Sequence, residues 1–217
     1  MSKNSRPQFG LSLYRIRFSQ PFGRTGKLAP KRIIVALTGA SGATYGFRLL
    51  QVLKELKVEA HGMVTRAGDT NLRIETSMTK EDALKLCAYR YDESDVGARL
   101  ASGSYLTDGM VIIPCSTRTL AGVAHGLSDN LVLRAAEVCL KEKRRLVLVP
   151  REAPLNVIHL KNMLLAAEAG AILLPAMPGF YHRPETINDM VDHVVGKVLD
   201  VLGIEHSLFQ RWAGTTS

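Results

Sequence analysis

The sequence has few cysteines and no long hydrophobic run, and both deficits exclude classes of protein. Only three of its 217 residues are cysteine, and the spacing of Cys87, Cys115 and Cys139 fits no common metal or redox motif. We therefore expect buried free thiols in a reducing compartment. The longest apolar stretches, such as residues 33–37, are far shorter than the roughly eighteen residues that a membrane helix needs. No membrane span is expected.

Acidic residues are absent from the first 32 positions, which carry eight Lys or Arg residues. Subtracting these eight from the 28 Lys and Arg of the whole chain leaves 20, which matches its 20 Asp and Glu, so the net charge of +8 belongs to this segment. A basic balance suggests nucleic acid or an anionic membrane, but a neutral remainder argues against both partners for the folded part.

Residues 1–30 are predicted to form a basic, weakly ordered extension. Their composition suits either a plain tail or an organelle transit peptide, and they contain no secretory hydrophobic segment. We expect a cytoplasmic protein, or a mitochondrial one if the extension is a transit peptide.

From position 31 onward, short apolar runs alternate with segments of helical periodicity. The runs predict strands over residues 33–38, 58–64, 110–114, 146–149 and 171–174. The periodic segments predict helices over residues 43–56, 67–75, 79–87, 116–126, 129–143, 156–169 and 184–202, the last opened by Pro184 in its first turn. Residues 88–109 are polar and are expected to be irregular.

This alternation predicts a doubly wound α/β fold, with a parallel sheet covered by helices on both faces and a single domain over residues 31–214. In such folds the ligand lies beyond the carboxyl ends of the strands. The residues that follow each predicted strand are therefore the candidates for a functional site.

Small and hydroxyl-bearing residues follow the first and third predicted strands. Gly39, Ala40 and Ser41 lead from the first strand into a helix, and residues 116–119 (Ser-Thr-Arg-Thr) follow the third. Backbone N–H groups at a helix N-terminus and nearby hydroxyls can hold a phosphate. A tight strand-to-helix turn or plain N-capping explains each segment equally well. Two such turns at one sheet edge favour a shared phosphate-bearing ligand.

Charged and aromatic residues follow the last two predicted strands. Arg151 and Glu152 come after the fourth strand, where Arg151 suits a phosphate and Glu152 a proton transfer, although an exposed ion pair explains them as well. Residues 175–184 contain aromatic and basic side chains that suit a pocket wall or a structured loop. Histidines such as His182 have no partner at zinc spacing, so no metal is expected.

Together these segments resemble the UbiX-type flavin prenyltransferase family, whose older names call its members aromatic-acid decarboxylases. The resemblance covers about residues 31–214 and is specific through the order and spacing of its motifs. The matching stretches are residues 38–43, 114–120, 134–137, 140–155, 159–163, 178–184 and 211–212.

The resemblance implies a Rossmann-like or flavodoxin-like flavoprotein that assembles as a homo-oligomer, often a dodecamer, with FMN at subunit interfaces. It implies transfer of a dimethylallyl group from dimethylallyl monophosphate to N5 and C6 of reduced FMN, without metal. The product, prenylated FMN, would serve a UbiD-type decarboxylase, acting in ubiquinone synthesis or in the breakdown of aromatic acids.

Site residues are implied position by position. Those matching the flavin contacts are Gly39, Ala40, Ser41, Thr65, Ser116, Thr117, Arg118, Thr119, Arg134 and Arg151. Those around the prenyl phosphate are Lys141, Arg151, Tyr181 and Lys197, the last being Arg in most of the family. Glu75 and Glu152 match acidic residues that handle protons, and Trp212 matches an aromatic residue near the reaction. The catalytic set is thus Glu75, Glu152, Lys141, Tyr181 and Trp212.

Three other functions stay open. A flavin-dependent cysteine decarboxylase has a similar fold, but its catalytic His after the first turn and its Pro-x-Met-Asn motif are missing here. A non-catalytic flavoprotein subunit would not need Lys141, Glu152 and Tyr181 together. Direct decarboxylation of aromatic acids would need a carboxylate site that the sequence does not suggest.

Overall fold

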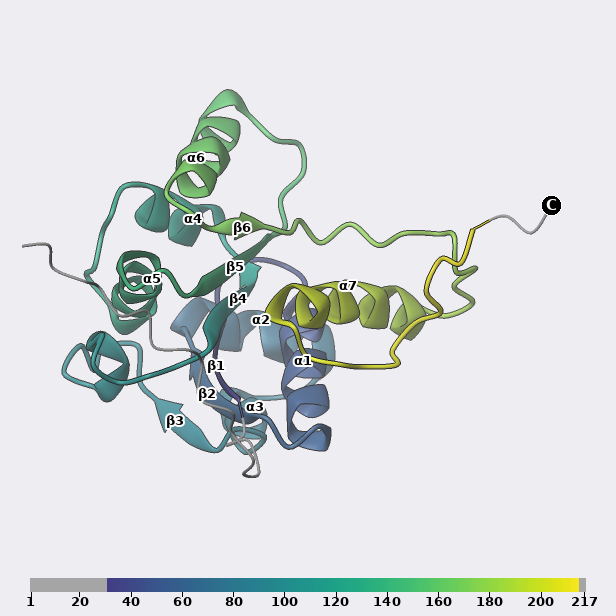
Figure 1. The fold of residues 1–217 in the computed structure, drawn as a ribbon, viewed down its shortest axis with the longest axis horizontal. Helices are drawn as coiled ribbons and strands as arrows, with labels where there is room; N and C mark the ends of the chain where they lie inside the picture. Colours follow the sequence, from purple (N-terminus) through teal and green to yellow (C-terminus); the bar gives the residue numbers. More distant parts are fainter. Residues whose placement is uncertain (1–30, 215–217) are drawn as a thin grey trace, which may run out of the picture.

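The computed structural model describes residues 31–214, and the extension predicted over residues 1–30 lies outside the described residues. Its centre is a six-stranded parallel sheet with the strand order β3-β2-β1-β4-β5-β6 (Figure 1). The chain builds outward from β1 to one edge, then returns to the centre and builds to the other edge. The predicted doubly wound α/β fold is confirmed.

Strands and helices alternate along most of the chain. The strands are β1 (Arg32–Leu37), β2 (Glu59–Val64), β3 (Tyr89–Tyr91), β4 (Gly109–Cys115), β5 (Arg145–Pro150) and β6 (Ile172–Leu173). The helices are α1 (Ala43–Glu55), α2 (Arg66–Thr76), α3 (Lys80–Leu84), α4 (Thr117–Ala124), α5 (Leu131–Lys141), α6 (Val157–Glu168) and α7 (Ile187–Leu202), with the 3₁₀ turn η1 (Arg99–Ala101) before β4. None of the helices described is long and apolar enough to cross a membrane.

The sheet is buried on both faces because alternate residues of its central strands enter two separate hydrophobic clusters. In β1, Ile33, Val35 and Leu37 pack with side chains of α1, α2 and α7. Ile34 and Ala36 point the other way and pack with side chains of α4, α5 and α6, which lie on the opposite side of the strands in Figure 1. Burial on both faces explains why the strands read as continuous apolar runs.

Most of residues 88–109 are irregular, as expected, but the expectation is wrong for two short elements of this segment, β3 and η1. Strand β3 pairs with β2 at the edge of the sheet. It is three residues long, and Tyr89 and Arg90 are exposed. A strand this short and this polar lacks the buried apolar run by which the other strands are recognised.

The start predicted for the last helix is also wrong. Helix α7 begins at Ile187, and Thr186, not Pro184, marks its N-terminus. The Thr186 hydroxyl accepts from Asp189 N, while the Asp189 carboxylate accepts from Thr186 N. This capping box satisfies the first N–H groups of the helix and fixes where it starts.

A buried histidine lies on β2 beside the edge strand. His61 is 0% exposed, and its ring nitrogens lie 2.9 Å from the Tyr91 hydroxyl and 3.0 Å from a Glu59 carboxylate oxygen. Its ring stacks on that of Tyr89 with the centroids 4.8 Å apart. Burial lowers the pKa of His61 below its usual 6.5, against the opposing effect of the Glu59 hydrogen bond.

We expect His61 to make stability depend on pH. Because its pKa is lower in the folded than in the unfolded state, its stabilising contribution is complete above pH 6.5 and is lost as the pH falls below that value. The free energy of unfolding should fall with a slope of up to about 1.4 kcal/mol per pH unit between neutral pH and pH 5. Urea unfolding at several pH values measures this slope.

The variant His61→Gln should lose that part of the slope, whatever its absolute stability. His125, which is exposed, provides the matched control, and His125→Gln should keep the slope of the natural protein. An unchanged slope in His61→Gln would contradict the assignment.

Candidate functional site

The carboxyl ends of β1 and β4 are tied together by one buried side chain. The Thr38 hydroxyl donates to the Pro114 carbonyl oxygen and accepts from Ser116 N, both at 2.8 Å, and Thr38 is 1% exposed. These neighbouring strands lead to opposite edges of the sheet, so the segments that follow them diverge. A crevice opens at such a point in doubly wound folds.

A cleft of about 560 Å³ occupies this position and reaches the ends of β1, β2 and β4. Its volume is within the range of small-molecule sites. Six predicted flavin contacts lie in its wall: Gly39, Thr65, Ser116, Thr117, Arg118 and Thr119. The structure therefore brings together residues from three separate turns, as the sequence predicts.

The turn after β1 is packed closely against the start of α2. A Cβ atom on Gly39 would lie 2.5 Å from the Ala67 Cβ, so only glycine fits there. Gly42 adopts a φ of 103°, a conformation that L side chains rarely adopt. Ala40 is buried, whereas Ser41 is exposed. These constraints fix the backbone path at the rim of the cleft.

The carboxylate of Glu75 binds the N-terminus of α1. It accepts from Gly42 N at 2.8 Å and from Ala43 N at 2.7 Å. A carboxylate in this position satisfies unpaired N–H groups and complements the helix dipole. The expected proton-handling role therefore competes with a structural role that the geometry shows.

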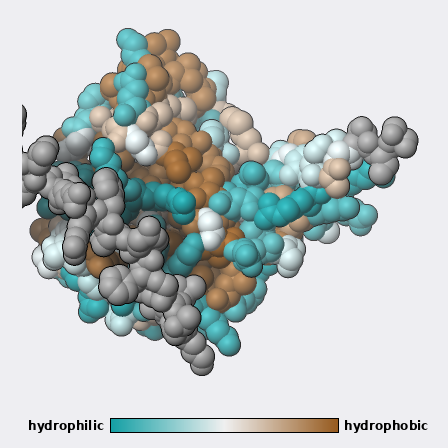
Figure 2. All heavy atoms as spheres, in the orientation of Figure 1, coloured by the Kyte–Doolittle hydropathy of each residue, from teal (hydrophilic) through white to brown (hydrophobic). Residues whose placement is uncertain are grey.

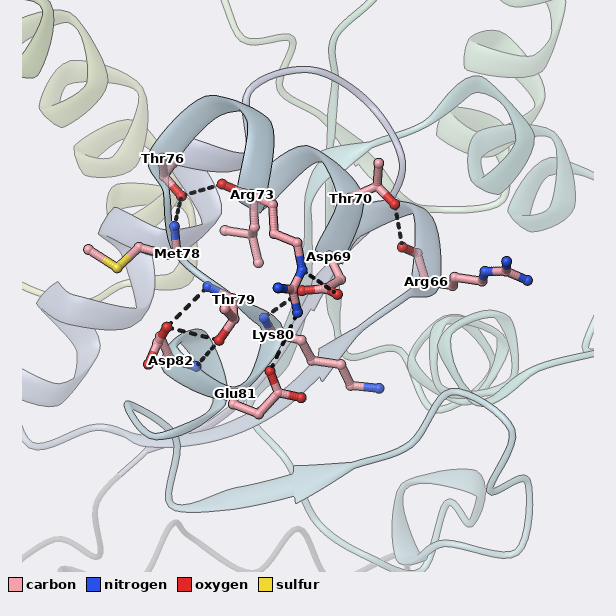
Figure 3. A network of polar contacts seen from close by, with 11 residues as sticks. Arg66, Asp69, Thr70, Arg73, Thr76, Met78, Thr79, Lys80, Glu81 and Asp82 are labelled. Atoms are coloured by element: carbon pink, nitrogen blue, oxygen red, sulfur yellow. Dashed lines mark hydrogen bonds and ion pairs between the residues drawn. The ribbon is translucent and has the colours of Figure 1, made fainter.

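Glu75 reaches α1 because the end of α2 is held by a polar network at the α2–α3 junction (Figure 3). Asp69 accepts from Arg73 Nε at 3.1 Å and from Lys80 N at 2.6 Å. Thr79 and Asp82 form the capping box of α3. The network anchors both helices around the segment that carries Glu75.

The N-terminus of α4 lines the opposite wall of the cleft. The Ser116 hydroxyl accepts from Thr119 N at 3.2 Å and donates to Thr119 Oγ1 at 3.0 Å. Ser116 is thus the N-cap of α4, as the capping alternative predicts, and it also lines the cleft. Arg118 is largely exposed, with a guanidinium nitrogen 4.0 Å from Asp129. N-capping and cleft lining coincide at this turn.

Arg151 joins the end of β5 to the first turn. Its Nε donates to the Ser41 carbonyl oxygen at 3.2 Å, and it lines a second cavity of about 230 Å³ with Glu152. Glu152 is exposed, and its carboxylate accepts from Ala153 N at 3.1 Å. The guanidinium of Arg151 therefore contacts the β1 turn, while Glu152 faces solvent.

Three further candidates lie in or beside α7: Lys197 is part of the helix, whereas Tyr181 lies in the segment after β6 and Trp212 in the C-terminal segment, which meet beside α7 in Figure 1. The Tyr181 and Trp212 rings form an edge-to-face pair with centroids 6.1 Å apart. Lys197 Nζ lies 3.6 Å from Asp200, which also binds Arg211 through two hydrogen bonds of 3.1 and 2.6 Å. Arg211 holds the pKa of the Asp200 carboxyl below its usual value, so this anchor of the C-terminal segment stays charged.

Lys141 and Arg134 lie elsewhere. Lys141 ends α5 just before the chain enters β5, so it lies at the amino edge of the sheet, where it pairs with Glu142. Arg134 donates to Glu137 at 2.8 Å and to the Ala101 carbonyl oxygen at 3.1 Å. Within a single chain, neither Lys141 nor Arg134 lines the cleft.

Sequence reasoning missed two residues of this region. Thr38 lies in the predicted strand over residues 33–38 and in the matching stretch 38–43, and Tyr45 lies in the predicted helix over residues 43–56, but neither is among the predicted site residues. Tyr45 lies near Arg151 and Glu75: burial raises its pKa, the charge of Arg151 lowers it and that of Glu75 raises it. The signal in the sequence that could have identified them is a hydroxyl group at a strand end and another in the first turn of the following helix.

Within residues 31–214, no group of three or more His, Cys, Asp or Glu residues is placed to hold a metal ion.

Comparison with known proteins identifies the family of the chain. The model of the family described as "Flavoprotein" matches residues 23–200. A "Probable UbiX-like flavin prenyltransferase" of Escherichia coli O157:H7 is 48% identical over 184 residues, which cover 84% of this chain and 93% of the relative. The "Flavin prenyltransferase PAD1, mitochondrial" of Saccharomyces cerevisiae is 46% identical, over 87% of this chain and 78% of the relative.

Solved structures lead to the same group. A dodecameric FMN-dependent UbiX-like decarboxylase from Escherichia coli O157:H7 superimposes with a TM-score of 0.82 at 48% identity, covering 84% of this chain and 100% of that one. A UbiX-type protein in complex with FMN and dimethylallyl pyrophosphate has a TM-score of 0.85 at 41% identity, covering 87% and 100%. The peptidyl-cysteine decarboxylase EpiD, at 19% identity and a TM-score of 0.58, shares the fold alone. The chain belongs to the flavoprotein family, among the UbiX-type flavin prenyltransferases.

Proposed function

We propose that this chain joins the dimethylallyl group of dimethylallyl monophosphate to N5 and C6 of reduced FMN and releases inorganic phosphate. The observation that carries the proposal is the cleft at the divergence of β1 and β4, lined by three turns that match the flavin contacts of the family. A relative of 41% identity, solved with FMN and dimethylallyl pyrophosphate, supports the pairing of these two ligands. Residues 31–214 then form a single flavin-binding domain.

The cleft fits FMN on physical grounds. The backbone at Gly39 has no room for a Cβ atom, and Thr65 and Thr119 supply hydroxyls from opposite walls. The N-terminus of α4, with Thr117 in its first turn, suits the FMN phosphate, because backbone N–H groups and the helix dipole attract anions. FMN supplies the nucleophilic ring that receives the prenyl group.

The remaining candidates suit the prenyl donor. Departure of phosphate from an allylic carbon leaves positive charge on the prenyl group and negative charge on the leaving oxygen. Lys141, Arg151 and Lys197 can stabilise the phosphate, most strongly in a site closed to water. Tyr181 can donate a hydrogen bond to it, and Trp212 can offer a π face to the allylic cation. Lys197 gives a point charge without the bidentate geometry of Arg.

We infer that the complete site is shared between copies of the chain. In one chain, Lys141 lies at the amino edge of the sheet, whereas Tyr181 and Trp212 lie in the segments beside α7. The dodecameric relative supports an oligomer of this kind.

Helix α6 offers a surface for such assembly. Its exposed large apolar residues and their neighbours are Leu155, Val157, Ile158, Leu160, Leu164 and Leu165. Figure 2 shows hydrophobic surface over this helix. A patch of this kind is typical of an interface.

The recipient of the product is proposed to be a UbiD-type decarboxylase. The contact with that enzyme would be transient, since prenylated FMN must leave one protein and enter the other. The cytoplasmic location stays a prediction, with mitochondria as the alternative.

The central test is the mass of the flavin. Purified protein is mixed with reduced FMN and dimethylallyl monophosphate without oxygen, and the flavin is examined by mass spectrometry. We expect the mass to rise by one prenyl unit, because the proposed reaction adds one dimethylallyl group to the flavin. An unchanged mass with folded, FMN-loaded protein would refute the proposed function.

Two carboxylates should respond differently to loss of charge. Glu152→Gln should slow prenylation by about 100-fold, the usual size of a general acid–base contribution, with little change in stability. Glu75→Gln should lower the free energy of unfolding by about 1 kcal/mol, because it weakens the capping of α1. Anaerobic single-turnover kinetics and urea unfolding measure the two effects. Unaltered kinetics in Glu152→Gln would remove its assigned role.

Mixed oligomers test whether the site is shared. Lys141→Met and Tyr181→Phe should each reduce prenylation strongly when alone, because each lacks one phosphate contact. Co-expressed, the two variants should regain part of the activity, because some interfaces then combine an intact Lys141 with an intact Tyr181. Each variant co-expressed with itself is the control. Mixed oligomers no more active than these controls would place the whole site within one chain.

A further inference from the structure

Tyr181, assigned above to the prenyl phosphate, is held by a buried histidine that the proposed reaction does not use. Its hydroxyl oxygen lies 3.2 Å from Nε2 of His193 on α7. His193 is 6% exposed, whereas Tyr181 is 46% exposed. One side of the phenol hydroxyl therefore contacts the protein interior, while the ring remains accessible to a ligand.

The other nitrogen of His193 fixes the tautomer of its ring. Gly179 N donates to His193 Nδ1 over 3.2 Å. A backbone N–H group only donates, so Nδ1 must offer a lone pair. In the neutral ring the hydrogen then lies on Nε2, and this N–H donates to the Tyr181 hydroxyl oxygen.

The direction of this bond decides what Tyr181 can do. A phenol has one hydrogen, and in the opposite tautomer Tyr181 would donate it to His193. With Nε2–H as the donor, Tyr181 accepts from His193 and keeps its own hydrogen for a second partner. A phosphate ester offers only acceptor oxygens, so it is the kind of partner that such a hydroxyl selects.

We propose that His193 is a positioning residue that keeps the Tyr181 hydroxyl as a hydrogen-bond donor toward the phosphate of dimethylallyl monophosphate, an inference that rests on the proposed function.

The surroundings of His193 favour the neutral ring that this requires. Burial lowers its pKa below the usual value, and the nearby His182 and Lys197 lower it further. Protonation would also place a hydrogen on Nδ1, facing the N–H of Gly179. The His182 ring stacks on that of His193 with centroids 4.8 Å apart, and Phe209 packs at the same centroid distance.

The backbone of Gly179 lies close to the rings of Tyr181 and His193. A Cβ atom at this position would lie 3.0 Å from the Tyr181 ring and 3.3 Å from the His193 ring. A larger residue would push both rings away from the backbone. Glycine therefore lets one N–H group reach His193 directly.

The test is a double-mutant cycle on ligand binding. Calorimetry measures the dissociation constant of dimethylallyl monophosphate for the oligomer loaded with oxidised FMN, in which no transfer occurs. His193→Phe keeps the ring and its packing but removes both hydrogen bonds, and we expect it to weaken binding about tenfold, as for one hydrogen bond to a charged group. Tyr181→Phe should weaken binding by a similar factor. The double variant should bind no worse than Tyr181→Phe alone.

His182→Phe is the matched control. His182 stacks on His193, and neither of its ring nitrogens has a hydrogen-bond partner among residues 31–214, so its replacement should leave binding unchanged. Three results would overturn the inference: unchanged binding in His193→Phe, additive losses in the double variant, or an equal loss in His182→Phe. The last would assign the effect to packing.

A measurement on the natural protein does not depend on any variant folding. Solid-state ¹⁵N spectra of histidine-labelled protein should show His193 with its hydrogen on Nε2, and a hydrogen on Nδ1 would overturn the inference. Failure of the proposed function is a different outcome. In that case dimethylallyl monophosphate binds and the cycle gives its result, but the mass of reduced FMN does not change.

Discussion

The buried hydroxyl of Thr38 joins the two strands between which the cleft opens. By bonding to the backbone on both sides of Cys115, it sets the distance between the turn after β1 and the N-terminus of α4. The Thr38 backbone N–H also donates to the Pro114 carbonyl oxygen, at 3.2 Å, so the backbone and the side chain of one residue together hold the two strand ends. Loss of the Thr38 hydroxyl would leave the Ser116 N–H group unpaired, which costs more than the bond itself contributes. Both walls of the cleft are thus linked through Thr38.

The other predicted site residues are distributed over the subunit. The cleft holds the turns, the segments beside α7 hold Tyr181 and Trp212, and the amino edge of the sheet holds Lys141. If the site is shared as proposed, activity would depend on assembly, because a lone subunit would present only part of it. Association of subunits through α6 would also cover the apolar side chains that this helix exposes.

Most of the fold could be predicted from the sequence, for a physical reason. Central strands buried on both faces must be continuously apolar, and the small residues after β1 and β4 mark where the chain turns at the ligand edge. Strand β3 was not predicted, because an edge strand of three residues is held by pairing with its neighbour and not by burial of its own side chains. The start of α7 was misplaced because the Thr186–Asp189 capping box, not Pro184, determines it. The tie between Glu75 and α1, and that between His193 and Tyr181, join residues at least a dozen positions apart, so no local pattern predicts them.

The Glu75 carboxylate makes the N-termini of α1 and α4 unequal as sites for an anion. Helices α1 and α4 both begin at the carboxyl edge of the sheet, and either would attract a phosphate. The carboxylate of Glu75 already occupies the first and would repel a second anion there. The Glu75 carboxylate thus competes with any anion at the N-terminus of α1, whereas the N-terminus of α4 remains open to the ligand. We therefore expect a ligand with one anionic end, such as a mononucleotide, to place that end at the N-terminus of α4.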